Sequence, residues 1–137
     1  MTPHALAATY AAAFPDQRPW SANEFADLLD HPTSIVAGTP DSFCIGRVVV
    51  DEAEILTFAT APSHQRQGLG AATLQSFEHA AKHRGATIVH LEVAADNLAA
   101  AALYAKAGYT ETSRRAAYYA RPNRPAVDAV LMMKKLS

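Results

Sequence analysis

The hydrophobic and polar positions of the N-terminal region follow a helical pattern. An alanine-rich run over residues 4–13 ends at the turn-forming residues 14–16, and Ser21 with Glu24 forms a capping box at the start of a second, shorter helix. Pro32 stops that helix, because the residue before a proline is driven out of helical geometry. The chain is therefore predicted to begin with two short helices.

Strand-like stretches follow the two helices. Residues 34–37, 43–50 and 54–61 are rich in β-branched and aromatic side chains. Asp51 and Glu52 are predicted to form the tight turn between the second and third stretches, although the usual Asn-Gly or Asp-Gly pair is missing. Strands joined by such short turns are expected to pair antiparallel.

The second half of the chain alternates between helical and strand patterns. Residues 68–84 carry apolar side chains at helical spacing, with Glu78 on the polar face. Residues 87–93 form a β-branched run typical of an interior strand, and an alanine-rich helix capped by Asp96 or Asn97 comes next. Two terminal strands are predicted at about 109–119 and 127–134, and they flank a loop over residues 121–125.

The predicted order is α-α-β-β-β-α-β-α-β-β. The early meander favours antiparallel pairing, whereas the later β-α-β step needs a crossover to a parallel neighbour. We therefore expect an α/β fold, an α+β arrangement with one mixed sheet and helices on both of its faces, formed by a single domain over residues 1–137.

Composition narrows the classes of function. Half of the 137 residues are hydrophobic and 18% are charged, which excludes a disordered polyelectrolyte. The formal net charge of −1 gives no global basic field, so no direct DNA binding is expected. No apolar run approaches the ~20 residues of a membrane-spanning helix, and no signal peptide is readable. Cys44 has no second cysteine to pair with, which fits the cytoplasmic localisation that we expect.

A glycine-rich turn, Gln-Arg-Gln-Gly-Leu-Gly over residues 65–70, separates a predicted strand from a predicted helix. Each glycine in a first helical turn costs about 1 kcal/mol relative to alanine, so a requirement for both is expected. An anion approaching the exposed N–H groups, with Arg66 at the rim, is one such requirement. A tight turn without a ligand is the other, and the motif alone favours neither.

Two known phosphate motifs do not fit this turn. A nucleotide P-loop ends in Gly-Lys-Ser/Thr, but Ala71 follows the last glycine here. A dinucleotide fingerprint needs a third glycine at position 73, where the chain has Thr73. A diphosphate ligand that is neither a typical nucleoside triphosphate nor NAD fits better.

Two further side chains are candidates for chemistry. Glu92 lies in a β-branched strand, where glutamate is rare, and shares a face with His90. A partly desolvated carboxylate there can act as a general base, although a solvated glutamate at a strand end is the commoner case. Asn97 and Tyr104 lie two turns apart on one helix face, and a tyrosine hydroxyl beside a bound cofactor can donate a proton. Tyr104 is otherwise an ordinary half-buried aromatic.

Together these motifs resemble the GNAT superfamily of acyl-CoA N-acyltransferases. The strand, the 65–70 turn and the following helix are similar to its motif for the pyrophosphate of acetyl-CoA. The stretch 91–109 resembles, more specifically, the RimI-type ribosomal-protein N-terminal alanine acetyltransferases. So do residues 14–15, 19–21, 114–119 and 128–132, which extends the resemblance over essentially the whole chain.

The resemblance implies roles for individual residues. Glu92 is implied to be the catalytic base, Tyr104 the proton donor and a cofactor contact, and Asn97 a contact to acetyl-CoA. The other implied cofactor-binding residues are Phe58, Ala59, Thr60, Gln65, Arg66, Gln67, Gly68, Leu69, Gly70 and Ala71. No metal site is expected, because the i, i+4 pair His79 and His83 lacks the glutamate of the zincin motif.

The implied function is transfer of an acetyl group from acetyl-CoA to a protein or peptide N-terminal amine, with ribosomal-protein alanine as the leading acceptor. An acetyltransferase for a small-molecule amine or amino acid and a non-catalytic acyl-CoA-binding module remain as alternatives.

The sequence departs from the subgroup's pattern at two places, of which the first concerns the local bulge and the second the substrate-side loop; a cluster of arginines has two interpretations. Thr60-Ala61-Pro62 stands where the subgroup commonly has valine and aspartate before proline, and one extra alanine separates the double arginine from the double tyrosine within 114–119. Four arginines near the C-terminus are either solvated surface or a docking site for an acidic peptide or ribosomal RNA. They are Arg114, Arg115, Arg121 and Arg124.

Overall fold

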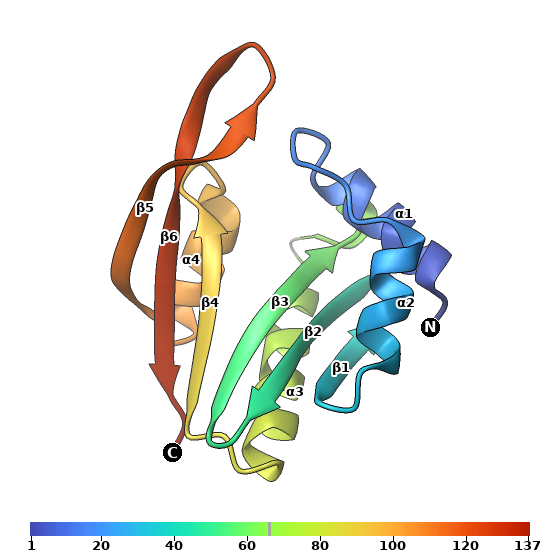
Figure 1. Ribbon diagram of the computed structural model, residues 1–137, viewed down its shortest axis with the longest axis vertical. Coiled ribbons are helices and arrows are strands. Elements are labelled where there is room, and N and C mark those ends of the chain that lie inside the picture. The colour runs from blue at the N-terminus through green and yellow to red at the C-terminus, as the bar shows by residue number, and fades with distance from the viewer. Residues whose placement is uncertain (66) are drawn as a thin grey trace.

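The computed structural model describes residues 1–65 and 67–137, and its elements follow the predicted order (Figure 1). A short 3-10 turn, η1, is an addition that the sequence pattern did not predict. The elements are α1 (Pro3–Ala13), α2 (Ala22–Asp30), β1 (Ser34–Thr39), β2 (Ser42–Val49), β3 (Glu52–Thr60), η1 (Pro62–His64), α3 (Leu69–His83), β4 (Ile88–Ala94), α4 (Leu98–Lys106), β5 (Thr110–Arg121) and β6 (Arg124–Lys135).

The strands form one mixed sheet in the order β1-β2-β3-β4-β6-β5. All neighbours pair antiparallel except β3 and β4, which are parallel, so the predicted mixed sheet is confirmed. The parallel pairing covers only residues 52–54 and 88–90. Beyond them the two strands separate, as Figure 1 shows.

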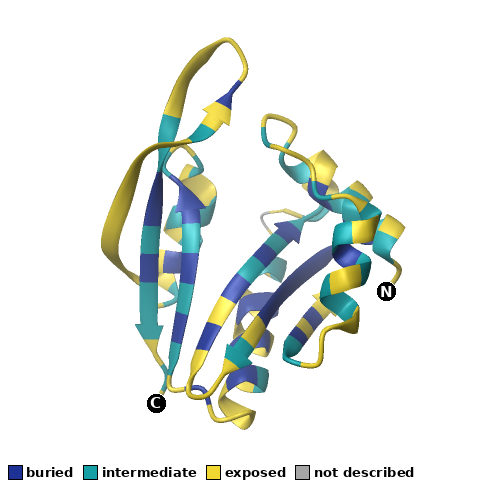
Figure 2. Ribbon diagram, viewed as in Figure 1, coloured by how far each residue is buried: buried dark blue, intermediate teal, exposed yellow. Residues whose placement is uncertain are grey.

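Helices cover both faces of the sheet, as predicted. The larger core lies on the face covered by α3 and α4, where Phe77 and Val89 are fully buried. Cys44 is fully buried in this core as a free thiol. The smaller core lies under α1 and α2, around Leu6 and Phe25. Figure 2 shows the buried positions along the strands between the two helical layers.

Within residues 1–65 and 67–137, no helix combines the length and the apolar character needed to cross a bilayer.

The β2–β3 turn lies one residue earlier than predicted. Val49 pairs with Glu52, so Val50 and Asp51 form the turn. Val50 has a φ of 59° and its side chain is 87% exposed. A β-branched residue in the left-handed region is strained, and nothing packs on this side chain to compensate.

We expect Val50→Gly to raise the free energy of unfolding by about 0.5–1 kcal/mol, because glycine adopts a positive φ without a steric penalty. Urea denaturation of both proteins measures the difference. Val49→Gly is the matched control: Val49 is exposed too but lies in the strand, so glycine there is expected to lower stability. An equal loss of stability in the two variants would contradict the claim that Val50 is strained.

The β5–β6 connection also differs from the predicted loop. The strands continue to Arg121 and resume at Arg124, so the loop predicted over 121–125 is reduced to the turn Pro122–Asn123. The extra alanine of this region is absorbed at Ala117, which has a φ of 48° and lies where the β5–β6 register shifts. Its N–H donates to Asp128 Oδ1 at 3.0 Å, which holds the bulge in place.

The prediction for Glu78 is wrong, because the structure buries this side chain. Tyr109 Oη donates to one carboxylate oxygen at 2.8 Å, and Lys134 Nζ donates to the other at 2.9 Å. A buried carboxylate needs such partners. Since α3 packs on β1 and β2, these contacts tie that half of the sheet to β6.

Candidate active site

The site begins where β3 bends away from β4. The β2–β3 register leaves Leu56 without a partner residue, and such a bulge bends a strand. Pairing with β4 has already ended at Glu54. Within the described residues, the edge of residues 57–60 that faces β4 therefore has no neighbouring strand. Its backbone groups, apart from the Thr60 carbonyl that accepts from Gln65, are open to a ligand. Thr57 Oγ1 is buried in the same stretch without a hydrogen-bond partner among those residues.

The N-terminus of α3 lies at the end of this stretch and has no side-chain cap. The other three α-helices begin with capping side chains, from Thr2, Ser21 and Asn97. The N-cap of α3 is Gly68, with a φ of 74°. The amides of residues 69–71 thus point out of the helix without an acceptor in the described part of the chain, as an anion-binding terminus requires.

A hydrogen bond connects the turn before α3 to the end of β3. Gln65 Nε2 donates to the carbonyl oxygen of Thr60 at 3.0 Å, and Gln67 is exposed. Arg66, predicted to line the same site, lies outside the described residues. Leu69 follows as the first residue of α3.

Gly70 shows that the fold itself does not require the second glycine. A Cβ atom there would lie 3.6 Å from Leu103 Cδ2 and from Thr60 Oγ1, and 3.8 Å from Phe58 Cε1. These are ordinary van der Waals separations. A methyl group at Gly70 would instead occupy the space between β3, α3 and α4. Neither the backbone conformation nor the packing of this turn therefore gives a reason for the second glycine.

Tyr104 borders the same space from α4. Its ring is buried and stands edge-on to Phe58, with the centroids 6.0 Å apart, and it also contacts Tyr109. Burial raises the pKa of Tyr104 well above its usual range, so the hydroxyl keeps its proton at neutral pH. Ala59, also predicted as a contact, is buried in the smaller core on the opposite face.

Glu92 lies on the other face of the sheet. Its neighbours Leu91 and Val93 belong to the larger core, so alternation along β4 turns Glu92 toward the α1 and α2 side. The side chain is 29% exposed, which agrees with the expected partial desolvation. Arg115 Nε lies 3.4 Å from Oε1, and Tyr119 Oη donates to Oε2 at 3.3 Å.

Asn97 caps α4, with Oδ1 accepting from the Ala100 N–H at 3.2 Å. Asp96 instead accepts from both Nε and Nη2 of Arg121, at 2.8 and 2.9 Å, and from Arg124. The hydrogen bonds from Arg121 are the main reason that the pKa of Asp96 lies far below its usual value.

The structure thus divides the predicted site residues between two faces. Phe58, Gly70 and Tyr104 come together on the α3 and α4 side, whereas Glu92 faces α1 and α2. The separation of β3 from β4 leaves an opening between the two groups. A donor on one face and an acceptor on the other can meet only there.

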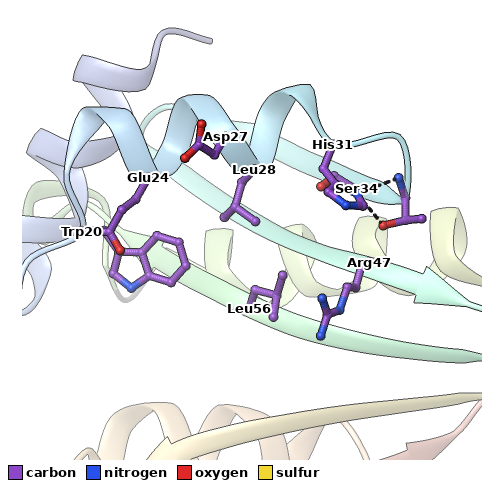
Figure 3. A pocket seen from close by; sticks show the side chains of 9 residues that line it. Trp20, Glu24, Asp27, Leu28, His31, Ser34, Arg47 and Leu56 are labelled. Atoms are coloured by element: carbon purple, nitrogen blue, oxygen red, sulfur yellow. Dashed lines mark hydrogen bonds between the residues drawn. The ribbon is translucent and has the colours of Figure 1, made fainter.

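A pocket of about 290 Å³ lies between α2 and the strands β1 to β3 (Figure 3). Trp20, Leu28 and Leu56 line its apolar part, with Glu24 and Asp27 projecting from α2. Trp20, in the connection between α1 and α2, packs against Phe25 in the smaller core. The pocket lies beside the bulge of β3, because Leu56 is one of its lining residues.

The four arginines near the C-terminus are neutralised by carboxylates in the structure. Arg114 pairs with Glu111, Arg115 with Glu92, and Arg121 with Asp96. Arg124 pairs with Asp96 and with an aspartate of the α1–α2 connection. This arrangement favours a network within the protein over a docking site for an acidic partner. Among the described residues, no group of three or more histidine, cysteine, aspartate or glutamate side chains is arranged to hold a metal ion.

The partners of Glu92 were missed by the sequence analysis. Tyr119 was noticed only as part of the resemblance, and Arg115 only there and in the arginine cluster. Their contacts with Glu92 join residues 23 or more positions apart, between β4 and β5 on either side of β6. No local spacing in the sequence could have revealed them.

Comparison with known proteins decides the family. The profile of the acetyltransferase (GNAT) family matches residues 4–109. The chain belongs to the GNAT acetyltransferase family. It is thus an acetyl-CoA-dependent N-acetyltransferase, and the predicted fold class is confirmed.

Individual relatives agree with this assignment. The [ribosomal protein bS18]-alanine N-acetyltransferase of Escherichia coli K12 is 39% identical over 100 residues, covering 73% of this chain and 67% of that protein. The crystal structure of the ribosomal-protein-S18-alanine N-acetyltransferase from Escherichia coli matches 98% of this chain and 88% of its own, with 33% identity and a TM-score of 0.87. Ard1 from Thermoplasma volcanium matches with 25% identity and a TM-score of 0.82, over 100% and 95% of the two chains.

Proposed function

We propose that this GNAT acetyltransferase acetylates the N-terminal α-amine of a protein, with the alanine of a ribosomal protein as the preferred acceptor. The observation that carries the proposal is the opposed placement of the uncapped α3 terminus and Glu92 on the two sides of the β3–β4 opening. The similarity to ribosomal-protein-S18-alanine N-acetyltransferases supports the choice of acceptor. A ribosomal-protein acceptor would place the reaction in the cytoplasm.

The α3 terminus holds the co-substrate in this proposal. The amides of residues 67–71 bind the diphosphate, helped by the positive end of the helix dipole. Phe58 and Thr60 contact the arm that leads to the thioester, and Asn97 contacts it from the start of α4. Acetyl-CoA supplies an acetyl group that is activated as a thioester.

Glu92 prepares the acceptor by taking a proton from its ammonium group, directly or through a water molecule. At pH 7 roughly a tenth of an α-amine with a pKa near 8 is already neutral, against a few in ten thousand for lysine. A carboxylate is a modest base. It therefore suits an N-terminal amine better than a lysine side chain.

Two other groups complete the chemistry. Backbone N–H groups at the free edge of residues 58–60 stabilise negative charge that develops on the carbonyl oxygen. The Tyr104 hydroxyl lies on the side of the departing sulfur and donates its proton there. The burial that raises the pKa of Tyr104 keeps this proton available until it is needed.

A panel of acceptors tests the function. With acetyl-CoA, an alanine-initiated peptide is expected to gain one acetyl group on its α-amine, as located by tandem mass spectrometry. The same peptide with a blocked N-terminus and an internal lysine is the control, and it is expected to stay unmodified because its amine is almost fully protonated. Acetylation of free amines or amino acids alone would favour the small-molecule alternative. Binding of CoA without any acetyl transfer would favour a non-catalytic module.

A further inference from the structure

A chain of contacts leads from a buried ion pair to the carboxylate of Glu92. The Arg121 side chain is only 2% exposed, and its two hydrogen bonds to Asp96 fix the plane of its guanidinium group. The guanidinium carbon lies 5.7 Å from the ring centroid of Tyr119, within the range of a cation–π contact. The hydroxyl of that ring donates to Glu92 Oε2 at 3.3 Å.

We propose that Tyr119 and Arg121 are positioning residues for acetyl transfer: Arg121 fixes the ring of Tyr119, and Tyr119 fixes Glu92 so that Oε1 faces the acceptor amine. The proposal rests on the proposed role of Glu92 as the base.

The two oxygens of Glu92 have different surroundings. Oε2 is held by Tyr119, a half-buried side chain. Oε1 faces Arg115, whose side chain is 55% exposed and lies 3.4 Å away. Since Arg115 can leave that position without losing buried contacts, Oε1 is the oxygen that a second cation, the ammonium group of an acceptor, can reach.

Tyr119 and Asp96 both have the protonation state that these contacts need at neutral pH. Burial, together with the nearby charge of Glu92, raises the pKa of Tyr119 well above its usual value, so the hydroxyl remains a donor at neutral pH. Asp96 stays ionised beside Arg121. Asp96 also directly precedes Asn97, the cap of α4, and α4 carries Tyr104. One ion pair thus links the base to the helix of the proton donor.

Tyr119→Phe removes only the hydroxyl. We expect its kcat to fall about tenfold, the loss for a hydrogen bond to a charged group, while the KM values for acetyl-CoA and for an alanine-initiated peptide stay within about twofold. Tyr118→Phe is the matched control: Tyr118 is 52% exposed, and its variant is expected to keep wild-type kinetics. A Tyr119→Phe enzyme with a raised peptide KM and an unchanged kcat would overturn the proposal in favour of acceptor binding.

Arg121→Lys tests the second link, because lysine keeps the charge but loses the paired hydrogen bonds. We expect a similar loss of kcat, and no further loss when it is combined with Tyr119→Phe, since both act through the same hydroxyl. Arg124→Lys, at the exposed partner of the same aspartate, is expected to leave kcat unchanged. Thermal unfolding of each variant identifies any loss that comes from misfolding. Additive losses in the double variant would overturn the proposal.

These experiments distinguish a failure of the positioning role of Tyr119 from a failure of the proposed role of Glu92. If Tyr119→Phe behaves like the wild type while Glu92→Gln is inactive, the positioning role is wrong and the base remains. If Glu92→Gln is fully active, the base assignment itself fails.

Discussion

Replacing Glu92 by glutamine is expected to lower kcat by about 10²–10⁴-fold, the usual contribution of a general base. Glutamine has nearly the same shape as glutamate but cannot accept the proton of the acceptor ammonium. Its amide also leaves Arg115 without a charged partner, although that side chain is half exposed and can turn to solvent. The fold and the affinity for CoA are expected to remain, because Glu92 faces the side opposite to the α3 terminus.

Steady-state kinetics with an alanine-initiated peptide, together with calorimetric titration of CoA, measures both parts of this expectation. Glu111→Gln is the matched control: Glu111 also pairs with an arginine of β5, at the surface, and its variant is expected to keep full activity. A Glu92→Gln enzyme with kcat within about twofold of the wild type would show that the amine loses its proton without this carboxylate.

Gly70→Ala is expected to change the stability of the protein and its affinity for CoA in opposite directions. Alanine is favoured over glycine in a helix by about 1 kcal/mol, and the added Cβ meets its neighbours at ordinary distances, so the free energy of unfolding should rise. The same methyl group occupies space that the co-substrate needs beside the α3 amides. Small displacements at such a site are costly, so the affinity for CoA should fall by about tenfold or more.

Ser76→Ala provides the control for this separation. Ser76 is exposed on α3, away from its first turn, and alanine there is expected to stabilise the helix slightly without changing CoA binding. Urea denaturation and calorimetry on the three proteins give both quantities. A Gly70→Ala protein that is less stable but binds CoA normally would mean that the glycine serves the turn and not a ligand.

The fold, and the elements that carry the candidate site residues, could be predicted because their signals are local. The capping box at Ser21, the glycine turn and the β-branched run around Glu92 each depend on a few adjacent residues. Each of these signals depends on interactions within one element or between two consecutive elements. The order of helices and strands is also set by such local signals, and that order predicts the mixed sheet.

The features that could not be predicted depend on contacts between distant segments. The helical pattern places Glu78 on the solvent-facing side of α3. Its burial is possible because Tyr109 and Lys134, 31 and 56 residues away, donate hydrogen bonds to its carboxylate. The contact between Tyr119 and Glu92 depends on the β5–β6 register, which the bulge at Ala117 shifts. Such register is set by the assembled sheet and not by any single strand.

The central claim is that the N-terminus of α3 binds the diphosphate of acetyl-CoA, and amide NMR tests it most directly. On addition of CoA, the amide resonances of Leu69, Gly70 and Ala71 are expected to show the largest shifts. Pantetheine, which lacks the diphosphate, is expected to leave these three resonances near their free positions. Largest shifts elsewhere in the protein, or the same shifts with pantetheine as with CoA, would contradict the claim.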